Sequence, residues 1–302
     1  MPCFRRLAAL AFLALIPACS NAGSDLGMGL PNGPGPSALV YIDRDFNAAF
    51  SAGDTTLAGA TVWLIVAGTH DTVASAATDA AGIVSFGGVT PGAYTVAVDS
   101  ALLQGDSLVS TLTPASVTVV ASGPPAGIQV RLGYPMVSVA QARARPPGSR
   151  VVVSGIIVAG RQTFADTTAY LRGVGAALRL LSVVNLSGGP TNLPGDTVRV
   201  LGTVAARDGQ PVLDSARVFF LTQLAPPVPD TVTTAQAATA RGGVLDADLV
   251  TIVGATIAAT TTQGADLVVT LDDGSGSLDL VIDSNVPIAP GPFIAGATVD
   301  AT

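Results

Sequence analysis

TAYLRGVGAALRLL, residues 168–181, alternates apolar and polar side chains with a period of two, the pattern of β-strands that bury one face. The side chains expected to point outward include Tyr170 and Arg179. The side chains expected to face a core are Ala169, Leu171, Leu178 and Leu180. The stretch therefore predicts strands with an apolar inner face and a polar outer face.

The same pattern occurs a second time in the chain. Residues 268–281, VVTLDDGSGSLDLV, align with residues 168–181 without gaps. The other matching segments are Val137–Ala142 with Val232–Ala237, the strand around Gly155 with that around Gly254, and Pro194–Val200 with Ala295–Ala301. Loop insertions account for the drift in offset between the copies, so residues 136–302 are expected to contain a duplicated module of about 95 residues.

The first copy is expected to form a small barrel of five strands that follow a short Ala-rich helix. The predicted strands are Arg150–Val158, Thr168–Leu171, Ala177–Val183, Asp196–Ala206 and Val212–Leu221. A long connection between the third and fourth strands suits an OB-like Greek-key barrel. The segments AYL at 169–171 and PGDTVRVLGTV at 194–204 resemble OB-type modules of bacterial surface proteins and extracellular nucleases. That resemblance implies binding of nucleic acid or carbohydrate. The second copy is expected to be an OB-like barrel that is incomplete at its C-terminal end.

Charge differs sharply between the two copies. Residues 136–223 contain nine Arg and four Asp, whereas residues 224–302 contain one Arg and nine Asp. OB-folds bind ligands on strands two and three and on two loops, where cations and aromatic rings hold single-stranded nucleic acid. The residues predicted to bind a polyanion in this way are Arg161, Phe164, Tyr170, Arg172, Arg179 and Arg207. The alternative is that these charges only keep exposed strand positions soluble.

The charge reversal also has a purely structural interpretation. Aligned positions carry opposite charges in the two copies, namely Arg172 and Asp272, Arg179 and Asp279, and Arg199 and Asp300. The two oppositely charged faces could therefore hold each other.

Residues 38–133 are expected to form a sandwich of two antiparallel sheets. Composition already favours an all-β protein, since only 12% of residues are charged while Gly and Pro number 34 and 21. The predicted strands are Leu39–Ile42, Ala60–Val66, Gly82–Phe86, Tyr94–Val98, Val117–Val120 and Ile128–Leu132. TDAAGIVSF at 78–86, followed by VTPGAYTV at 89–96, resembles bacterial prealbumin-like repeats such as the B-type repeats of serine-aspartate adhesins and the carboxypeptidase regulatory-like domains. The resemblance implies a stalk or spacer.

A candidate Ca²⁺ loop lies in this sandwich. Its oxygen-bearing side chains occupy positions 1, 3, 5, 9 and 12 of a twelve-residue loop: Asp43, Asp45, Asn47, Ser51 and Asp54. Hard oxygen ligands at this spacing suit Ca²⁺, although Ala48 replaces the usual Gly and Asp54 the usual Glu. The alternative is an Asp- and Asn-rich surface turn.

The first residues of the chain have the pattern of an export signal. Arg5 and Arg6 precede an apolar segment from Leu7 to Ile16, which is too short to span a bilayer stably. The sequence Ile-Pro-Ala-Cys at 16–19 resembles the lipobox of bacterial lipoproteins, with Pro17 as an unusual middle residue. The resemblance implies cleavage before Cys19, acylation of Cys19, and a membrane-anchored protein at the bacterial cell surface or outer membrane. An ordinary secretory signal is the alternative.

Little in the sequence predicts catalysis. The one histidine, His70, has no catalytic partner among Lys, Glu or Cys residues, because the chain contains no Lys or Glu and no cysteine after Cys19. The sequence Asp272-Asp273-Gly274 indicates a hairpin turn rather than a catalytic carboxylate pair. We expect no enzyme and no small-molecule substrate. The leading expectation is a surface-anchored binding lipoprotein; the alternatives are the anchoring part of a longer nuclease and a structural envelope protein. The expected divisions are 1–18 signal, 19–37 tether, 38–133 sandwich, 136–223 basic barrel, 224–230 Pro-rich linker and 231–302 acidic barrel.

Overall fold

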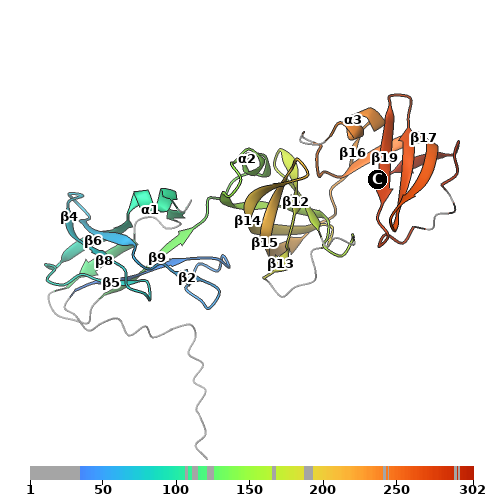
Figure 1. Ribbon diagram of the computed structural model, residues 1–302. Coiled ribbons are helices and arrows are strands. Elements are labelled where there is room, and N and C mark those ends of the chain that lie inside the picture. The colour runs from blue at the N-terminus through green and yellow to red at the C-terminus, as the bar shows by residue number, and fades with distance from the viewer. Residues whose placement is uncertain are drawn as a thin grey trace, which may run out of the picture.

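The computed structural model describes residues 35–105, 108–110, 115–120, 126–164, 168–186, 193–240, 243, 245–288, 291 and 293–302. The fold is all-β, as expected, and Figure 1 shows three β-rich units in a row in the order of the chain. The predicted signal, Cys19 and almost all of the tether lie outside the described residues.

The first unit is a β-sandwich. One 5-stranded sheet has the order β2-β1-β9-β7, with β5 also paired to β1, and a 4-stranded sheet has the order β4-β3-β6-β8. The first sheet contains β1 (Ser37–Ile42), β2 (Thr55–Thr56), β5 (Ile83–Ser85), β7 (Val109–Ser110) and β9 (Gly127–Gly133). The second contains β3 (Thr61–Val66), β4 (Thr72–Ala77), β6 (Gly92–Val98) and β8 (Ala115–Val119), and helix α1 (Ser100–Gly105) follows β6. Phe86 and Tyr94 are buried between the sheets, as the motif predicts.

Strand β4 was not predicted from the sequence. Its residues, TVASAA, are mostly small, and it lies at the edge of its sheet with all six residues exposed or half-buried. An edge strand of small residues lacks the apolar alternation that identifies a half-buried strand.

The second unit is a closed barrel. Its strands are β10 (Arg150–Ala159), β11 (Ala169–Gly173), β12 (Ala176–Leu180), β14 (Asp196–Arg207) and β15 (Gln210–Gln223), with a short β13 (Val184–Asn185) beside β15. The sheet runs β12-β11-β10-β14-β15, and parallel pairing of β12 with β15 at Arg179–Val212 and Leu180–Leu213 closes it. All five predicted strands are present.

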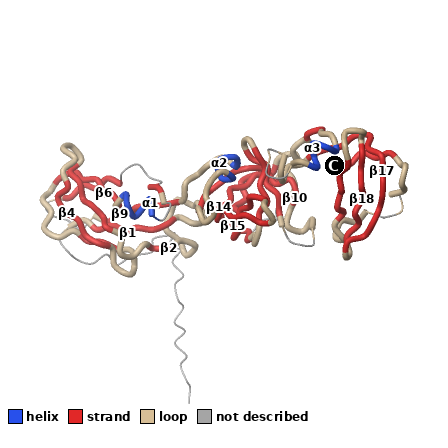
Figure 2. Tube along the Cα trace, turned by 45° about the horizontal axis from the view of Figure 1, so that its top comes forward, coloured by secondary structure: helices blue, strands red, loops and turns tan. Residues whose placement is uncertain are grey.

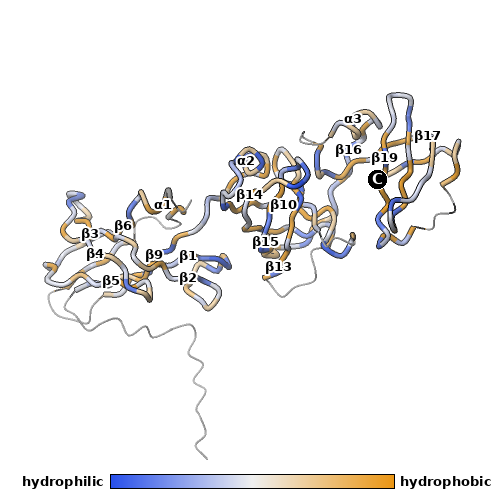
Figure 3. The backbone as a smooth tube through the Cα atoms, viewed as in Figure 1, coloured by the Kyte–Doolittle hydropathy of each residue, from blue (hydrophilic) through white to orange (hydrophobic). Residues whose placement is uncertain are grey.

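Burial follows the alternation that the sequence predicts. The expected core residues Ala169, Leu171, Leu178 and Leu180 are all buried, whereas Tyr170 and Arg179 between them are only half-buried. Figure 3 shows apolar residues recurring along the strands of each unit.

The third unit repeats this topology but remains open. β16 (Asp230–Thr231), β17 (Val250–Gln263), β18 (Asp266–Asp272) and β19 (Ser277–Ile282) form one sheet, and β20 (Thr298–Ala301) pairs with β17. Within the described part of residues 224–302, no strand takes the place of β15. Leu278 and Leu280 are therefore half-buried, whereas Leu178 and Leu180 of the first copy are buried.

Each copy begins with a short helix, α2 (Val139–Arg143) or α3 (Thr234–Ala238). Ser138 and Gln141 form a capping box on α2, and Thr233 and Gln236 form the same box on α3. Figure 2 shows the two helices at corresponding places beside their barrels. The matching capping geometry supports the duplication independently of the strands.

Candidate functional site

The predicted metal loop lies between β1 and β2, and the pairing of these strands gathers its carboxylates. Asp43 follows β1 and Asp54 precedes β2, and the strands pair at Ile42–Thr55. One carboxylate oxygen from each of Asp43, Asp45 and Asp54 lies within 4.8 Å of the others. The structure therefore brings three of the five predicted ligands together.

The other two predicted ligands differ in their placement. The Ser51 hydroxyl lies 2.9 Å from an Asp45 oxygen and so borders the carboxylate cluster. Asn47 is exposed; its amide nitrogen donates to Asp45 at 2.9 Å, and its oxygen accepts from the backbone of Ala49 at 2.7 Å. Asn47 therefore contributes to the turn in this conformation.

Asp43 is the buried member of the cluster, with 6% of its surface exposed. Its carboxylate accepts hydrogen bonds from the backbone of Phe46 at 2.7 Å and Ala48 at 3.2 Å, and Arg131 lies 3.4 Å away. Burial raises the pKa of Asp43, and the two backbone donors oppose that rise. Several carboxylate and hydroxyl oxygens in one partly buried loop form a donor set of the kind that Ca²⁺ prefers.

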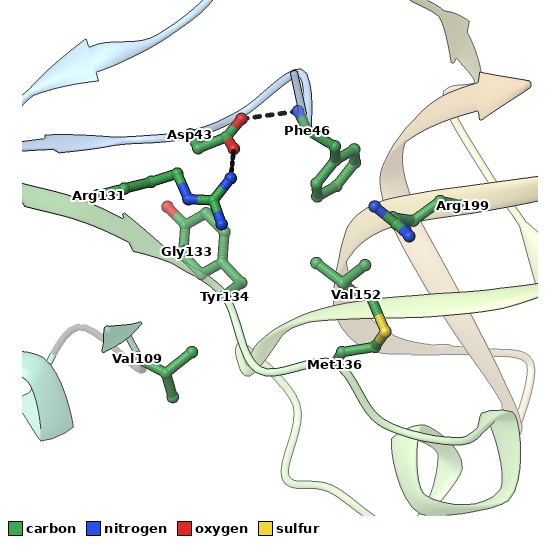
Figure 4. Close-up of a pocket in the computed structure, with 9 residues that line it drawn as sticks. All are labelled: Asp43, Phe46, Val109, Arg131, Gly133, Tyr134, Met136, Val152 and Arg199. Atoms are coloured by element: carbon green, nitrogen blue, oxygen red, sulfur yellow. Dashed lines mark hydrogen bonds and ion pairs between the residues drawn. The ribbon is translucent and has the colours of Figure 1, made fainter. Parts of the chain in front are cut away.

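The tip of the same loop joins the sandwich to the closed barrel. Phe46, which adopts a left-handed backbone conformation, contacts the barrel residue Phe219 edge to face, with ring centroids 6.2 Å apart. The guanidinium of Arg199 lies over the Phe46 ring at 5.4 Å. Figure 4 shows Phe46 and Arg199 facing each other across the boundary, close to the Asp43–Arg131 pair.

A second set of contacts strengthens this sandwich–barrel joint. Arg150 of β10 donates to the Tyr134 hydroxyl at 2.8 Å and stacks over its ring. Val152 and Leu201 of the barrel belong to the same apolar cluster as the sandwich core. The joint surrounds a cavity of about 320 Å³ lined by Asp43, Phe46, Val109, Arg131, Gly133, Tyr134, Met136, Val152 and Arg199. The predicted boundary near residues 133–135 is therefore a packed interface.

Charged side chains form the joint between the two barrels. Arg143 of α2 pairs with Asp246 at 3.2 Å, and only 10% and 6% of the two side chains are exposed. Arg143 also donates to the backbone oxygens of Ala177 and Asp246, and the Gln210 amide donates to the Asp246 carboxylate.

Arg172, which was predicted to bind a polyanion, contacts the barrel–barrel joint in this structure. Its guanidinium pairs with Asp230 and, at 3.2 Å, with Asp248, and it donates to the Val228 carbonyl at 2.9 Å. Burial raises the pKa of Asp248, and the charge of Arg172 counteracts this effect. The predicted linker at 224–230 is thus held against the first barrel.

The aligned charge reversals do not pair with each other in the described structure. Arg199 stacks on Phe46, Asp279 accepts from the Thr270 hydroxyl, and Asp300 accepts from the Gly254 amide. Opposite charges do meet at the barrel–barrel joint, but Arg143 pairs there with Asp246, and Arg172 pairs with Asp230 and Asp248 rather than with its aligned residue Asp272.

The remaining predicted polyanion-binding residues lie on or beside the outer wall of the first barrel. Tyr170 is directly opposite Arg179, and Phe164 packs edge to face on Tyr170 with centroids 5.7 Å apart. The Arg161 guanidinium lies 3.5 Å from the Val183 carbonyl, and Arg207 is exposed at the end of the β14–β15 hairpin. Phe164, Tyr170 and Arg179 thus form a small aromatic and cationic group.

The structure also places the residues weighed for catalysis. His70 is exposed on the β3–β4 hairpin. Asp273 accepts hydrogen bonds from Ser275 and Thr234, which lower its pKa, and so ties the β18–β19 hairpin to the start of α3. Within the described ranges, no helix is long and apolar enough to cross a membrane.

Sequence comparison gives no relative, since no protein-family profile matches and no curated protein is similar. Comparison with solved structures gives distant likenesses. The Bacillus anthracis TIE protein is 13% identical with a TM-score of 0.22 over 63% of this chain, and this chain spans only 32% of its length. BcpA, the major pilin subunit of Bacillus cereus, is 10% identical with a TM-score of 0.26, over 88% of this chain and 93% of its own.

Proposed function

We propose that this chain is a non-catalytic structural protein of the bacterial cell surface, a spacer that holds three β-modules in a fixed row. The main support is that both boundaries between modules are built from specific side-chain contacts. At the sandwich–barrel joint, Phe46 contacts both Phe219 and Arg199, and the barrel–barrel joint has the buried Arg143–Asp246 pair. Modules that only shared a flexible chain would not need such contacts.

The energies of these contacts favour fixed joints. An edge-to-face aromatic pair contributes about 0.5–1.5 kcal/mol beyond its buried area, and a cation–π contact at an exposed site about 0.5–1 kcal/mol. Removing one partner of a buried ion pair costs about 3–5 kcal/mol. The aromatic and cation–π terms amount to a few times thermal energy, which disfavours bending at the sandwich–barrel joint. At the barrel–barrel joint, the buried pair fixes the relative position of Arg143 and Asp246, because neither charge is tolerated there without the other.

Paired spin labels can test the fixed arrangement, because Cys3 and Cys19 are the only cysteines and can be replaced by Ser. Labels at Thr72→Cys in the sandwich and Thr261→Cys in the third unit should give a narrow distance distribution. Phe46→Ala should broaden it, whereas Phe50→Ala, which removes an aromatic contact with Tyr41 inside the sandwich, should not. A broad distribution in the parent protein would contradict the proposal.

Attachment to the membrane through Cys19 is the second part of this proposal, and it rests on the signal and lipobox-like residues at 5–19. Replacing Cys19 by Ser should abolish incorporation of a palmitate analogue and association with the membrane fraction. Label retained by the Cys19→Ser variant would rule out this anchor.

We also propose that the β1–β2 loop binds structural Ca²⁺ through Asp43, Asp45 and Asp54, with Ser51 beside them. The convergence of three carboxylates supports this assignment. Because Asp43 accepts from the Phe46 amide, an ion in the loop would also stabilise the sandwich–barrel joint.

Polyanion binding is a second candidate function, favoured by the Phe164, Tyr170 and Arg179 group on the barrel wall. Single-stranded oligonucleotides should bind weakly to the full chain, with affinity that falls as salt rises. Arg179→Asp should remove most of that affinity. Identical oligonucleotide-binding curves for the parent and variant proteins would rule out this function.

A further inference from the structure

A second cavity at the sandwich–barrel joint is lined by three arginines from different parts of the chain. Its volume is about 90 Å³, and its lining residues are Arg44, Arg150, Leu201, Gly202, Thr203, Ser215 and Arg217. Arg44 comes from the β1–β2 loop of the sandwich, whereas Arg150 and Arg217 come from β10 and β15 of the barrel. The cavity is therefore complete only when the two modules are docked.

A β-bulge shapes the barrel side of this cavity. Leu201 is opposite Arg217 and Thr203 is opposite Asp214, so β15 carries an extra residue here. Ser215 accommodates it with a left-handed backbone at φ 52°. Bulges re-aim neighbouring side chains and recur next to functional sites.

The three guanidinium groups have few partners of their own. Among the described residues, no carboxylate forms an ion pair with Arg44, Arg150 or Arg217. Arg44 donates to the Thr55 hydroxyl at 3.1 Å but has a buried Nε without a partner, and Arg150 donates to Tyr134. Clustered cations without counter-charges repel one another, and a bound anion relieves that repulsion.

The charges around Arg217 agree with this picture. Burial and, to a smaller extent, the charge of Arg44 lower the pKa of Arg217, while Asp45, Asp54 and Tyr134 act in the opposite direction.

We propose that Arg44, Arg150 and Arg217 bind one free tetrahedral oxyanion, such as sulfate or phosphate, between the sandwich and the closed barrel. Planar guanidinium groups suit oxyanions because each can donate two parallel hydrogen bonds. The volume of about 90 Å³ is well above the minimum that holds one water molecule, so the cavity has room for one small ion. The bound ion would bridge the modules, because the site draws cations from both.

The test uses the full chain in EDTA, which separates this site from the proposed calcium loop. Sodium sulfate, with ionic strength held constant by sodium chloride, should raise the melting temperature and give a saturable calorimetric titration. Arg217→Gln and Arg44→Gln should each weaken sulfate binding by about tenfold or more. Arg145→Gln, a matched loss of charge outside the cavity, should leave binding unchanged.

Two results would overturn the proposal. Equal sulfate affinity in the parent and Arg217→Gln proteins would show that the cavity binds no anion. Loss of binding in Arg217→Gln but not in Arg44→Gln would confine the site to the barrel and refute the bridge. Should Arg217→Gln fold poorly, Arg217→Lys keeps the charge without the planar fork and should still bind sulfate more weakly than the parent.

Discussion

Arg143 and Asp246 form a buried ion pair, 3.2 Å apart, across the boundary between the two copies of the duplicated module. Each copy supplies one sign of charge: Arg143 lies on the helix that opens the first copy, and Asp246 follows the equivalent helix of the second. The opposite net charges of the two copies therefore allow ion pairs to form where the copies contact each other.

Breaking this pair should loosen the barrel–barrel joint. Arg143→Met leaves Asp246 buried without its cation, so we expect a loss of about 3–5 kcal/mol from the joint. Faster thermolysin cleavage within residues 224–230 and unfolding at a lower urea concentration would show that the joint has loosened. The double variant with Asp246→Leu should recover much of the loss, and Arg145→Met should resemble the parent. Equal cleavage rates for the parent and Arg143→Met proteins would contradict a stabilising role of this ion pair at the barrel–barrel joint.

Calcium should raise the melting temperature of the full chain, because an ion that binds only the folded loop stabilises it. At ten times its Kd the expected gain is about 1.4 kcal/mol. Asp45→Asn should remove this gain, whereas Asp71→Asn, on the exposed β3–β4 hairpin, should keep it. A melting temperature of the parent protein that does not change with millimolar calcium would refute the site.

The raised pKa of Asp43 predicts opposite pH trends with and without calcium. In EDTA, a group whose pKa is higher in the folded state gains stability as pH falls through that raised pKa. With calcium, protons compete with the ion over the same range, so the calcium-dependent gain should shrink. Parallel melting series from pH 7 to pH 4 would test both trends, and a calcium gain independent of pH would contradict this role of Asp43.

Asp273 predicts a separate acid sensitivity in the third unit. Hydrogen bonds lower the pKa of Asp273 in the folded state. Its contribution to folding stability is therefore complete above the ordinary Asp pKa of about 3.9, and it is lost as the pH falls through the lowered pKa of the folded state. Asp273→Asn should therefore be less stable than the parent at pH 6, with the difference narrowing towards pH 2. A difference that stays constant over this range would show that ionisation of Asp273 is irrelevant.

Local patterns were enough to predict most of the fold. The alternation in residues 168–181 placed Leu178 and Leu180 inside and Arg179 outside, and the spacing of Asp43, Asp45 and Asp54 identified a converging loop. The charge reversal suggested that the two barrels contact each other, but the residues that form the joints were not predicted, because contacts such as Phe46–Phe219 and Arg143–Asp246 join residues more than 100 positions apart. The ion pairs of Arg172 with Asp230 and Asp248 were missed for the same reason, because an outward side chain in a barrel has the same sequence pattern whether it contacts solvent or another module.

The pairing of β1 with β9 determines how the sandwich responds to a pulling force. These strands are parallel neighbours, with Ser37 opposite Gly127 and Ile42 opposite Leu132, and the chain enters at the start of β1 and leaves for the barrel at the end of β9. Tension applied at these two ends drives the strands past each other lengthwise, so their hydrogen bonds are loaded together in shear rather than opened one at a time. In the proposed role as a spacer, the first module would therefore carry force through these hydrogen bonds before it unfolds.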